Sequence, residues 1–290
     1  MKKLLLSILT INFLTFAIAQ DKKAYQLFTK EGKAVKYGKM MKDLKEADII
    51  LIGEMHNNPI CHWLELEITK DIEFEKKKST VLGAEMYESD DQIVIDEYLS
   101  GQIKKKHFVT EAKVWSNNKT DYQPLVDFAK ENELNFVATN IPRRYANFVA
   151  RKGLDELNNL TDNQKQYIAP IPFEVDLTMK GYKMFLDMNM GHGSEMTPTK
   201  MAQAQGAKDA TMAHFILENW KKGEIFIHYN GTYHSDNFEG IGYYLLKRNP
   251  KLKIVTIAAV GQNSIDNLED ENKDLANYIL AIPESMCTTY

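Results

Sequence analysis

Residues 47–56 read ADIILIGEMH, an apolar run that ends at a glycine, a carboxylate and a histidine. Residues 47–52 form the first of five runs rich in Ile, Val and Phe, and the others are residues 79–84, 135–139, 224–229 and 253–260. Their apolar character is nearly continuous, which is typical of parallel strands covered on both faces. Helical patterns separate the runs. The sequence therefore predicts an α/β fold with a mostly parallel central sheet flanked by helices.

The third and fourth runs are separated by a long segment, residues 141–223. This gap is too long for a simple crossover, so we expect a mostly helical insertion within a single domain of residues 21–290. Helices are expected at residues 154–167 and 202–220, the second ending before Gly223. The acidic tail after Gln262 is expected to lie at the periphery.

The N-terminus resembles a secretory signal. Lys2 and Lys3 precede an apolar stretch over residues 4–18, and Ala17-Ile18-Ala19 forms a small-x-small cleavage site. We therefore expect a signal peptide at residues 1–20 and an exported protein that is periplasmic, secreted or at the cell surface. The cleavage site has no cysteine, so the chain is not a lipoprotein by sequence.

Charge and cysteine content exclude several classes of protein. The formal net charge of −4 becomes −6 once Lys2 and Lys3 leave with the signal, which argues against a nucleic-acid partner. Cys61 lies in an apolar helical pattern and is expected to be a buried free thiol, although a disulfide with Cys287 stays open. Neither a CxxC pair, a Gly-x-Ser-x-Gly elbow, a phosphate-binding glycine loop nor an HExxH helix is present.

Ionisable residues follow several of the predicted strands. Glu54 and His56 follow the first strand, Glu85 the second, Arg143 and Arg144 the third, and His234 the fourth. Ligands bind at the carboxyl edge of an open parallel sheet, so we expect a site centred on Glu54, His56, Glu85 and His234. Two of these ends share the spacing Gly-x-x-His, at Gly53 and Gly231.

This set of side chains allows three kinds of chemistry: binding of a divalent metal, acid–base catalysis, or capture of a polar ligand. His56 and Glu85 could also have purely structural roles. His56 could cap a helix or satisfy backbone groups in the core, and Glu85 could form a salt bridge to Arg143 or Arg144.

The predicted insertion is rich in methionine around Gly191-His192-Gly193. The residues are Met179, Met184, Met188, Met190, Met196 and Met201. The helical spacing of Met179, Tyr182, Phe185 and Met188 favours core filling or an apolar wall for a large flat ligand over a soft copper site. His192 could reach into the site. His62, His107 and His214 are expected to have no role in the site, whereas His228 could have either role.

An ordered set of motifs resembles the ChaN-like haem-binding family, within the wider superfamily of Tiki, TraB and erythromycin esterase proteins. The residues are Gly53-Glu54-x-His56, Gly83-x-Glu85-Met86 with Gln92, Trp115 with Tyr122 and Pro124, Asn140-x-Pro142-Arg143, the stretch from Gln205 through Asp209 to Met212-Ala213, Gly231-x-x-His234, and Gly240-Ile241. The resemblance runs from about Asp48 to Gly261.

The resemblance implies an exported protein of haem and iron uptake that binds haem in a pocket shared by two subunits, with a tyrosine as iron ligand. A phenolate suits ferric iron, and basic side chains can pair with haem propionates. Tyr122, Tyr182 and Tyr233 are the best-placed tyrosines. The expected haem-binding residues are Glu54, His56, Glu85, Tyr122, Arg143, Tyr182, His192, Tyr233 and His234, and the expected partners are haem, a second copy of the chain and an outer-membrane haem receptor or transporter.

A metal-dependent hydrolase, a peptidase or esterase, is the alternative. In that case His56, His234 and Glu85 would hold Zn²⁺ or a similar ion, and Glu54 would complete the catalytic set by activating water. An α/β domain that binds an unrelated small ligand is the third interpretation.

Overall fold

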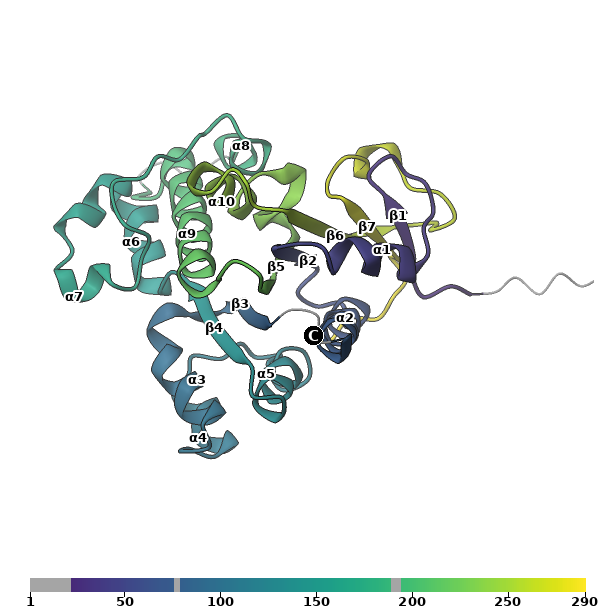
Figure 1. Ribbon diagram of the computed structural model, residues 1–290. Helices are drawn as coiled ribbons and strands as arrows, with labels where there is room; N and C mark the ends of the chain where they lie inside the picture. Colours follow the sequence, from purple (N-terminus) through teal and green to yellow (C-terminus); the bar gives the residue numbers. More distant parts are fainter. Residues whose placement is uncertain (1–21, 76–78, 189–193) are drawn as a thin grey trace, which may run out of the picture.

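The computed structural model describes residues 22–75, 79–188 and 194–290 (Figure 1). The predicted signal peptide, His192 and Met190 lie outside these residues.

A seven-stranded sheet forms the centre of the fold, with strand order β1-β7-β6-β2-β5-β3-β4. All neighbouring pairs are parallel except β1 and β7. The strands are β1 (Gln26–Thr29), β2 (Ile49–Glu54), β3 (Thr80–Glu88), β4 (Asn135–Asn140), β5 (Ile225–Gly231), β6 (Ile254–Gln262) and β7 (Tyr278–Pro283). The α/β fold and the five predicted strands are confirmed.

The expectation of a peripheral tail after Gln262 was wrong. Residues Tyr278–Pro283 form β7, which pairs with β6 on one side and with β1 on the other. The strand has the sequence YILAIP and is buried over most of its length. It is short and follows an acidic segment, so the sequence pattern did not indicate it. The tail therefore extends the sheet.

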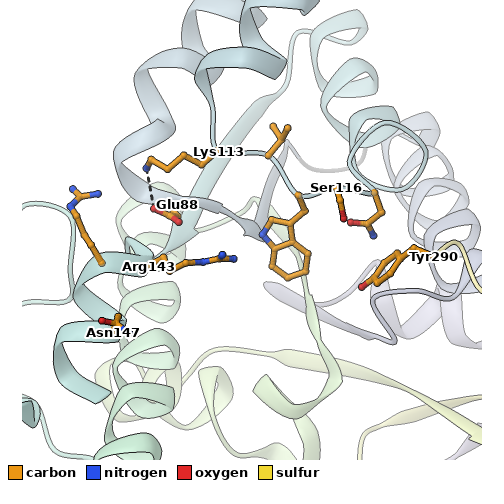
Figure 2. Close-up of a pocket in the computed structure, with 10 residues that line it drawn as sticks. Glu88, Lys113, Ser116, Arg143, Asn147 and Tyr290 are labelled. Atoms are coloured by element: carbon orange, nitrogen blue, oxygen red, sulfur yellow. Dashed lines mark hydrogen bonds and ion pairs between the residues drawn. The ribbon is translucent and has the colours of Figure 1, made fainter. Parts of the chain in front are cut away.

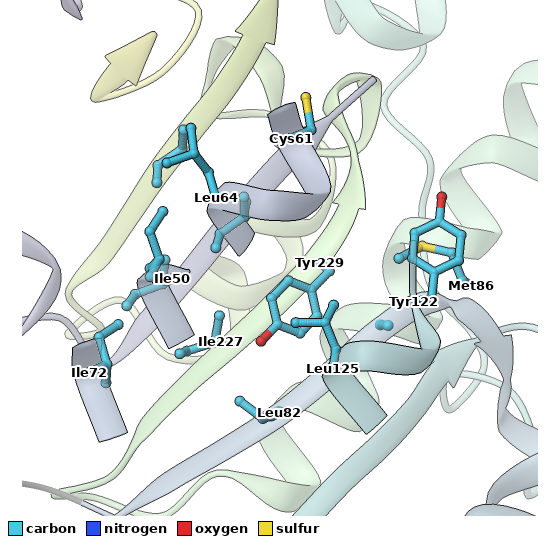
Figure 3. Packing of buried hydrophobic residues seen from close by; sticks show 14 of the residues in the cluster. Ile50, Cys61, Leu64, Ile72, Leu82, Met86, Tyr122, Leu125, Ile227 and Tyr229 are labelled. Atoms are coloured by element: carbon cyan, nitrogen blue, oxygen red, sulfur yellow. The ribbon is translucent and has the colours of Figure 1, made fainter. Parts of the chain in front are cut away.

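Helices cover both faces of the sheet, and β2 shows why. Ile50 and Ile52 point to the cluster formed with α1 (Tyr37–Leu44), α2 (Pro59–Glu75), α3 (Gln92–Leu99), α4 (Lys105–Glu111) and α5 (Gln123–Glu131), part of which Figure 3 shows. Ile49 and Leu51 point to the opposite cluster, with α9 (Pro198–Asn219) and α10 (Ile241–Arg248). A strand buried on both faces needs apolar residues at every position, which explains the continuous run.

The segment between β4 and β5 carries α6 (Arg143–Lys152), η2 (Leu154–Asn159), α7 (Asp162–Lys165), α8 (Lys180–Leu186) and α9. The expected helix at residues 202–220 is the greater part of α9. The expected helix at residues 154–167 is instead two short ones, because Leu160 is extended and Thr161 begins a new helix through a capping box with Gln164.

Cys61 is buried on α2, Cys287 is exposed, and both are free thiols, so the disulfide is not formed. Among the described residues, none of the helices has the length and apolar character needed to span a bilayer.

Candidate functional site

The sheet order brings the polar strand ends together. β5 lies between β2 and β3, so the carboxyl ends of these three strands are neighbours. Glu54 of β2 is the direct register partner of Gly231 of β5. Glu85 of β3 contacts the same glycine from the other side, because its Oε2 accepts a hydrogen bond from Gly231 N at 2.7 Å. The predicted site at the carboxyl edge therefore forms around Gly231.

Glu54 organises one half of the site. Its Oε1 lies 2.6 Å from His56 Nδ1 and accepts a hydrogen bond from the Tyr122 hydroxyl at 2.8 Å. His56 also packs edge-on against Trp115, with ring centroids 4.9 Å apart. Glu54 is buried, whereas the His56 side chain is 33% exposed. His56 is therefore oriented from below and can contact a ligand.

His62 supports Glu54 from α2, a role that the sequence interpretation missed. Its Nδ1 lies 3.0 Å from Glu54 Oε2 and 3.4 Å from Glu65 Oε2, and its Nε2 lies 3.3 Å from Asp121 Oδ2. His62 and Glu65 are three residues apart and so share one helix face. This spacing directly after Gly53-Glu54-x-His56 was the signal that could have identified them.

Glu85 and His234 form the other half. Glu85 Oε1 lies 3.1 Å from His234 Nε2, and His234 Nδ1 makes a very short contact with Asp209 of α9. The Tyr182 hydroxyl donates to Asp209 Oδ2 at 2.6 Å. All four side chains are buried. The predicted salt bridge from Glu85 to Arg143 or Arg144 is not formed, because Glu85 pairs with His234 and Arg144 pairs with Asp90.

Two glycines allow this close packing. A Cβ at Gly231 would lie 2.6 Å from His56 Nε2, so a side chain there would displace the imidazole. Gly240 has a φ of 56°, and a Cβ there would lie 2.2 Å from the carbonyl oxygen of His234. Only glycine adopts this backbone without steric cost.

The paired charges shift the pKa values of the site. Burial alone would raise the pKa of Glu54, but the hydrogen bond with His56 and the nearby imidazole of His62 lower it to about 2. Burial opposes protonation of His234, yet the charges of Glu85 and Asp209 raise its pKa to about 10. Although burial also acts against the ionised form of Glu85, the charge of His234 holds its pKa well below the ordinary value. Both carboxylates are therefore ionised at neutral pH, and His234 is protonated.

Three adjoining cavities lie over this layer. The histidine cavity, of about 480 Å³, is lined by residues that include His56, Glu85, His234, Arg143 and Lys208. The Lys180 cavity, of about 560 Å³, shares His56, Met184, Gly231 and Tyr233 with it. The arginine cavity, of about 870 Å³, shares Glu88, Trp115 and Arg143 with the histidine cavity. We call the three adjoining cavities the groove, and each has a volume in the range that holds small ligands.

Figure 2 shows Arg143 and Tyr290 pointing into the arginine cavity from opposite sides, with Lys113 paired to Glu88. Within the part of the chain that the structure describes, Arg143 and Lys208 have no ion-pair partner. Both cations line the histidine cavity and are therefore free to meet an anionic ligand.

The three candidate tyrosines are placed differently. Tyr122 and Tyr182 are buried beneath the groove and donate to Glu54 and Asp209. Tyr233 is 63% exposed and lines both the histidine and the Lys180 cavities. Met184, which is 42% exposed, lines the same two cavities. Only Tyr233 of the three tyrosines stands at the surface of the groove.

The described methionines of this set have different surroundings. Met179 is buried, Met196 and Met201 pack against α6, Met184 borders the groove, and Met188 is exposed. His228 is buried, donates to or accepts from Thr139 Oγ1 at 2.7 Å, and has its pKa lowered to about 4 by burial. His214 packs against Phe215, and His107 is exposed, as expected.

Under the hydrolase alternative, the expected metal ligands were His56, His234 and Glu85. Among residues 22–75, 79–188 and 194–290, the set of three side chains whose ligand atoms lie within 4.8 Å of one another is Glu54, His62 and Glu65. His56, Glu85 and His234 do not make such a set, because His56 Nδ1 bonds to Glu54 while both nitrogens of His234 face Asp209 and Glu85.

Comparison with known proteins identifies the family. Residues 40–245 match the family described as "Haem-binding uptake, Tiki superfamily, ChaN". The chain belongs to the ChaN family. No curated protein matches it.

The structure is similar to several solved structures, and one of them, a ChaN protein, shows the fold. The structure of ChaN from Campylobacter jejuni, described as showing cofacial heme binding, has a TM-score of 0.67 over 90% of this chain and 98% of that chain, at 20% identity. The type III effector HopBA1 has a TM-score of 0.46 at 12% identity over 84% of this chain and 91% of its own. An erythromycin esterase, EreC, has a TM-score of 0.45 at 11% identity over 82% and 78%. The ChaN fold predicted by the resemblance is confirmed.

Proposed function

We propose that this ChaN-family protein binds haem in the groove at the carboxyl edge of the sheet. The observation that carries the proposal is Tyr233, an exposed phenol beside Met184 above the histidine layer. A phenolate is a suitable ligand for ferric haem, and an apolar side chain such as Met184 can pack on the porphyrin. The match to the haem-binding uptake family supports the same ligand.

The remaining groove residues take complementary roles in this proposal. Arg143 and Lys208 bind the haem propionates through charge-assisted hydrogen bonds. His56 meets the ligand from below, while Glu54, Glu85 and His234 fix the floor on which it rests. Tyr122 and Tyr182 act as positioning residues, since their hydroxyls are committed to buried carboxylates.

A haem titration of the mature protein tests the proposal. We expect a saturable shift of the Soret band in the wild type, a loss of the phenolate signature in Tyr233→Phe, and no change in Tyr25→Phe, because Tyr25 lines none of the three cavities. Light scattering on the same samples measures whether haem draws two copies together. A wild type without any Soret shift would refute haem binding, and an unchanged Tyr233→Phe would refute the ligand assignment.

Export and uptake belong to the same proposal. A haem carrier acts outside the cytoplasm and passes its cargo to an outer-membrane receptor or transporter. The basic and apolar start of the sequence supports export. Mass spectrometry of the protein produced from its full-length chain should find an N-terminus near residue 20 in the extracytoplasmic fraction. An intact N-terminus retained in the cytoplasm would contradict export.

Hydrolysis is the second candidate, favoured by the 2.6 Å contact between Glu54 and His56. A buried carboxylate that orients a partly exposed imidazole is a known arrangement for general-base catalysis. The candidate predicts turnover of a chromogenic ester or peptide that disappears in His56→Gln. Absence of turnover across such substrates, in protein that binds haem, would leave haem capture as the function.

A further inference from the structure

A second site lies beneath the groove, on the side of Glu54 that faces α2. Glu54, His62 and Glu65 are buried there, and their ligand atoms lie within 4.8 Å of one another. Asp121 adds a third carboxylate next to His62 Nε2. Three buried carboxyl groups around one imidazole need a shared proton or a cation to offset the repulsion among them, because isolated buried charges are costly.

Two carboxylate atoms in this cluster lack a hydrogen-bond partner. Glu65 is 0% exposed, and its Oε1 has no hydrogen-bond partner. Glu54 Oε2 is also unsatisfied: it lies 3.0 Å from His62 Nδ1, but without the alignment of a hydrogen bond. Buried polar atoms are almost always paired, so these two atoms point to a ligand.

The spacing of the donors suits a metal ion. The ligand atoms of a tetrahedral zinc ion lie about 3.3 Å apart, given metal–ligand bonds of about 2.0–2.1 Å. His62 Nδ1 lies 3.0 Å from Glu54 Oε2 and 3.4 Å from Glu65 Oε2. The chain thus supplies three donors, one imidazole nitrogen and one oxygen from each of two carboxylates.

Neighbouring groups contact the donors on the side away from the proposed ion, as is common for metal ligands. His62 Nε2 lies 3.2 Å from the His56 carbonyl oxygen and 3.3 Å from Asp121 Oδ2, either of which can accept its proton and leave Nδ1 free to bind a metal. The other oxygen of Glu54 is held by Tyr122 and His56. Outer contacts of this kind orient the ligands of a bound metal.

We propose that Glu54, His62 and Glu65 bind one divalent transition-metal ion, Zn²⁺ or Mn²⁺, as a structural site beneath the groove. The ion anchors Glu54 and thereby the ring of His56 above it. Because the site is buried, the ion enters during folding. A proton shared between Glu54 and Glu65 is the competing arrangement, and it needs no metal.

Metal analysis of haem-free mature protein distinguishes the two. The protein is purified without an affinity tag from medium containing both metals, passed through metal-free buffer, and analysed by mass spectrometry. We expect about one equivalent in the wild type and in Glu67→Gln, and a loss of roughly tenfold or more in Glu65→Gln and His62→Gln. Glu67 lies on the same helix but pairs with Lys70 at the surface, which makes it a matched control.

Refolding with and without metal is the second test of the proposed metal site. Wild-type protein is unfolded with chelator and refolded without metal, with Zn²⁺, or with Mn²⁺. We expect a higher Tm with one of the metals in the wild type and in Glu67→Gln, but not in Glu65→Gln. Wild-type protein that holds no metal as purified and gains none on refolding would establish the shared proton and overturn the proposal, as would equal metal content in Glu65→Gln.

Refolding of the wild type distinguishes a bound metal ion from a shared proton even if Glu65→Gln does not fold. The haem titration is independent of it, so failure of one proposal does not imply failure of the other.

Discussion

Glu85 and His234 form a buried ion pair, with 3.1 Å between Oε1 and Nε2, that ties the end of β3 to the turn after β5. Glu85 also accepts a hydrogen bond from Gly231 N, and His234 is held by Asp209 on α9. One carboxylate thus connects two strands and, through the imidazole, a helix on the face of the sheet. We therefore expect this pair to hold the floor of the groove in place.

Removing the charge of Glu85 should destabilise the protein. In Glu85→Gln the protonated His234 keeps only Asp209 as an anionic partner, so we expect a loss of roughly 3 kcal/mol in the free energy of unfolding, measured by chemical denaturation. Glu88→Gln is the control, because its pair with the partly exposed Lys113 should be worth less than about 1 kcal/mol. Equal effects in the two variants would contradict the importance of the buried pair.

The pKa of His234 predicts how stability depends on pH. Its folded-state pKa of about 10 lies above the ordinary value of 6.5, so the folded chain keeps a proton that the unfolded chain loses. Its contribution is complete below about pH 6.5 and is lost as the pH rises toward about 10. Denaturation at several pH values should show this decline in the wild type and a flatter profile in His234→Gln. An equal decline in both would reject the assignment.

A methyl group at Gly231 should disturb the site. Its Cβ would lie 2.6 Å from His56 Nε2, so Gly231→Ala should displace the imidazole, cost about 1–3 kcal/mol in stability and weaken haem binding. Gly38 in α1 has open space around a Cβ and a helical backbone, so Gly38→Ala should be neutral or stabilise by up to about 1 kcal/mol. Thermal unfolding and haem titration of both variants measure the contrast, and similar behaviour would refute it.

Arg143 should act on the propionates and not on the porphyrin ring. We expect Arg143→Gln to weaken haem binding by about tenfold or more, the loss of one charged hydrogen bond, while binding of haem dimethyl ester stays unchanged. Arg151→Gln on the same helix is the control, since Arg151 bonds to Asn147 and lines none of the three cavities. An equal loss for both ligands would assign Arg143 to general packing.

The sequence by itself determined the α/β class, five strands and the polar residues at their ends. This was possible because a strand buried on both faces has a continuous apolar sequence, and because ligand-binding residues commonly follow the carboxyl ends of such strands. It did not reveal β7, a short apolar strand behind an acidic loop. Nor did it assign roles to His62 and Glu65, although they lie three residues apart on α2, or to Asp209 on α9.

Only the tertiary structure decided which residues meet. In sequence β5 follows β3 and β4, but in space it lies between β2 and β3, which places Gly231 against both Glu54 and Glu85. Local patterns contain no information on strand order, because that order depends on how helices of different lengths pack across the sheet. The same packing buried Tyr122 and Tyr182 and left Tyr233 exposed, a distinction that residue type alone does not make.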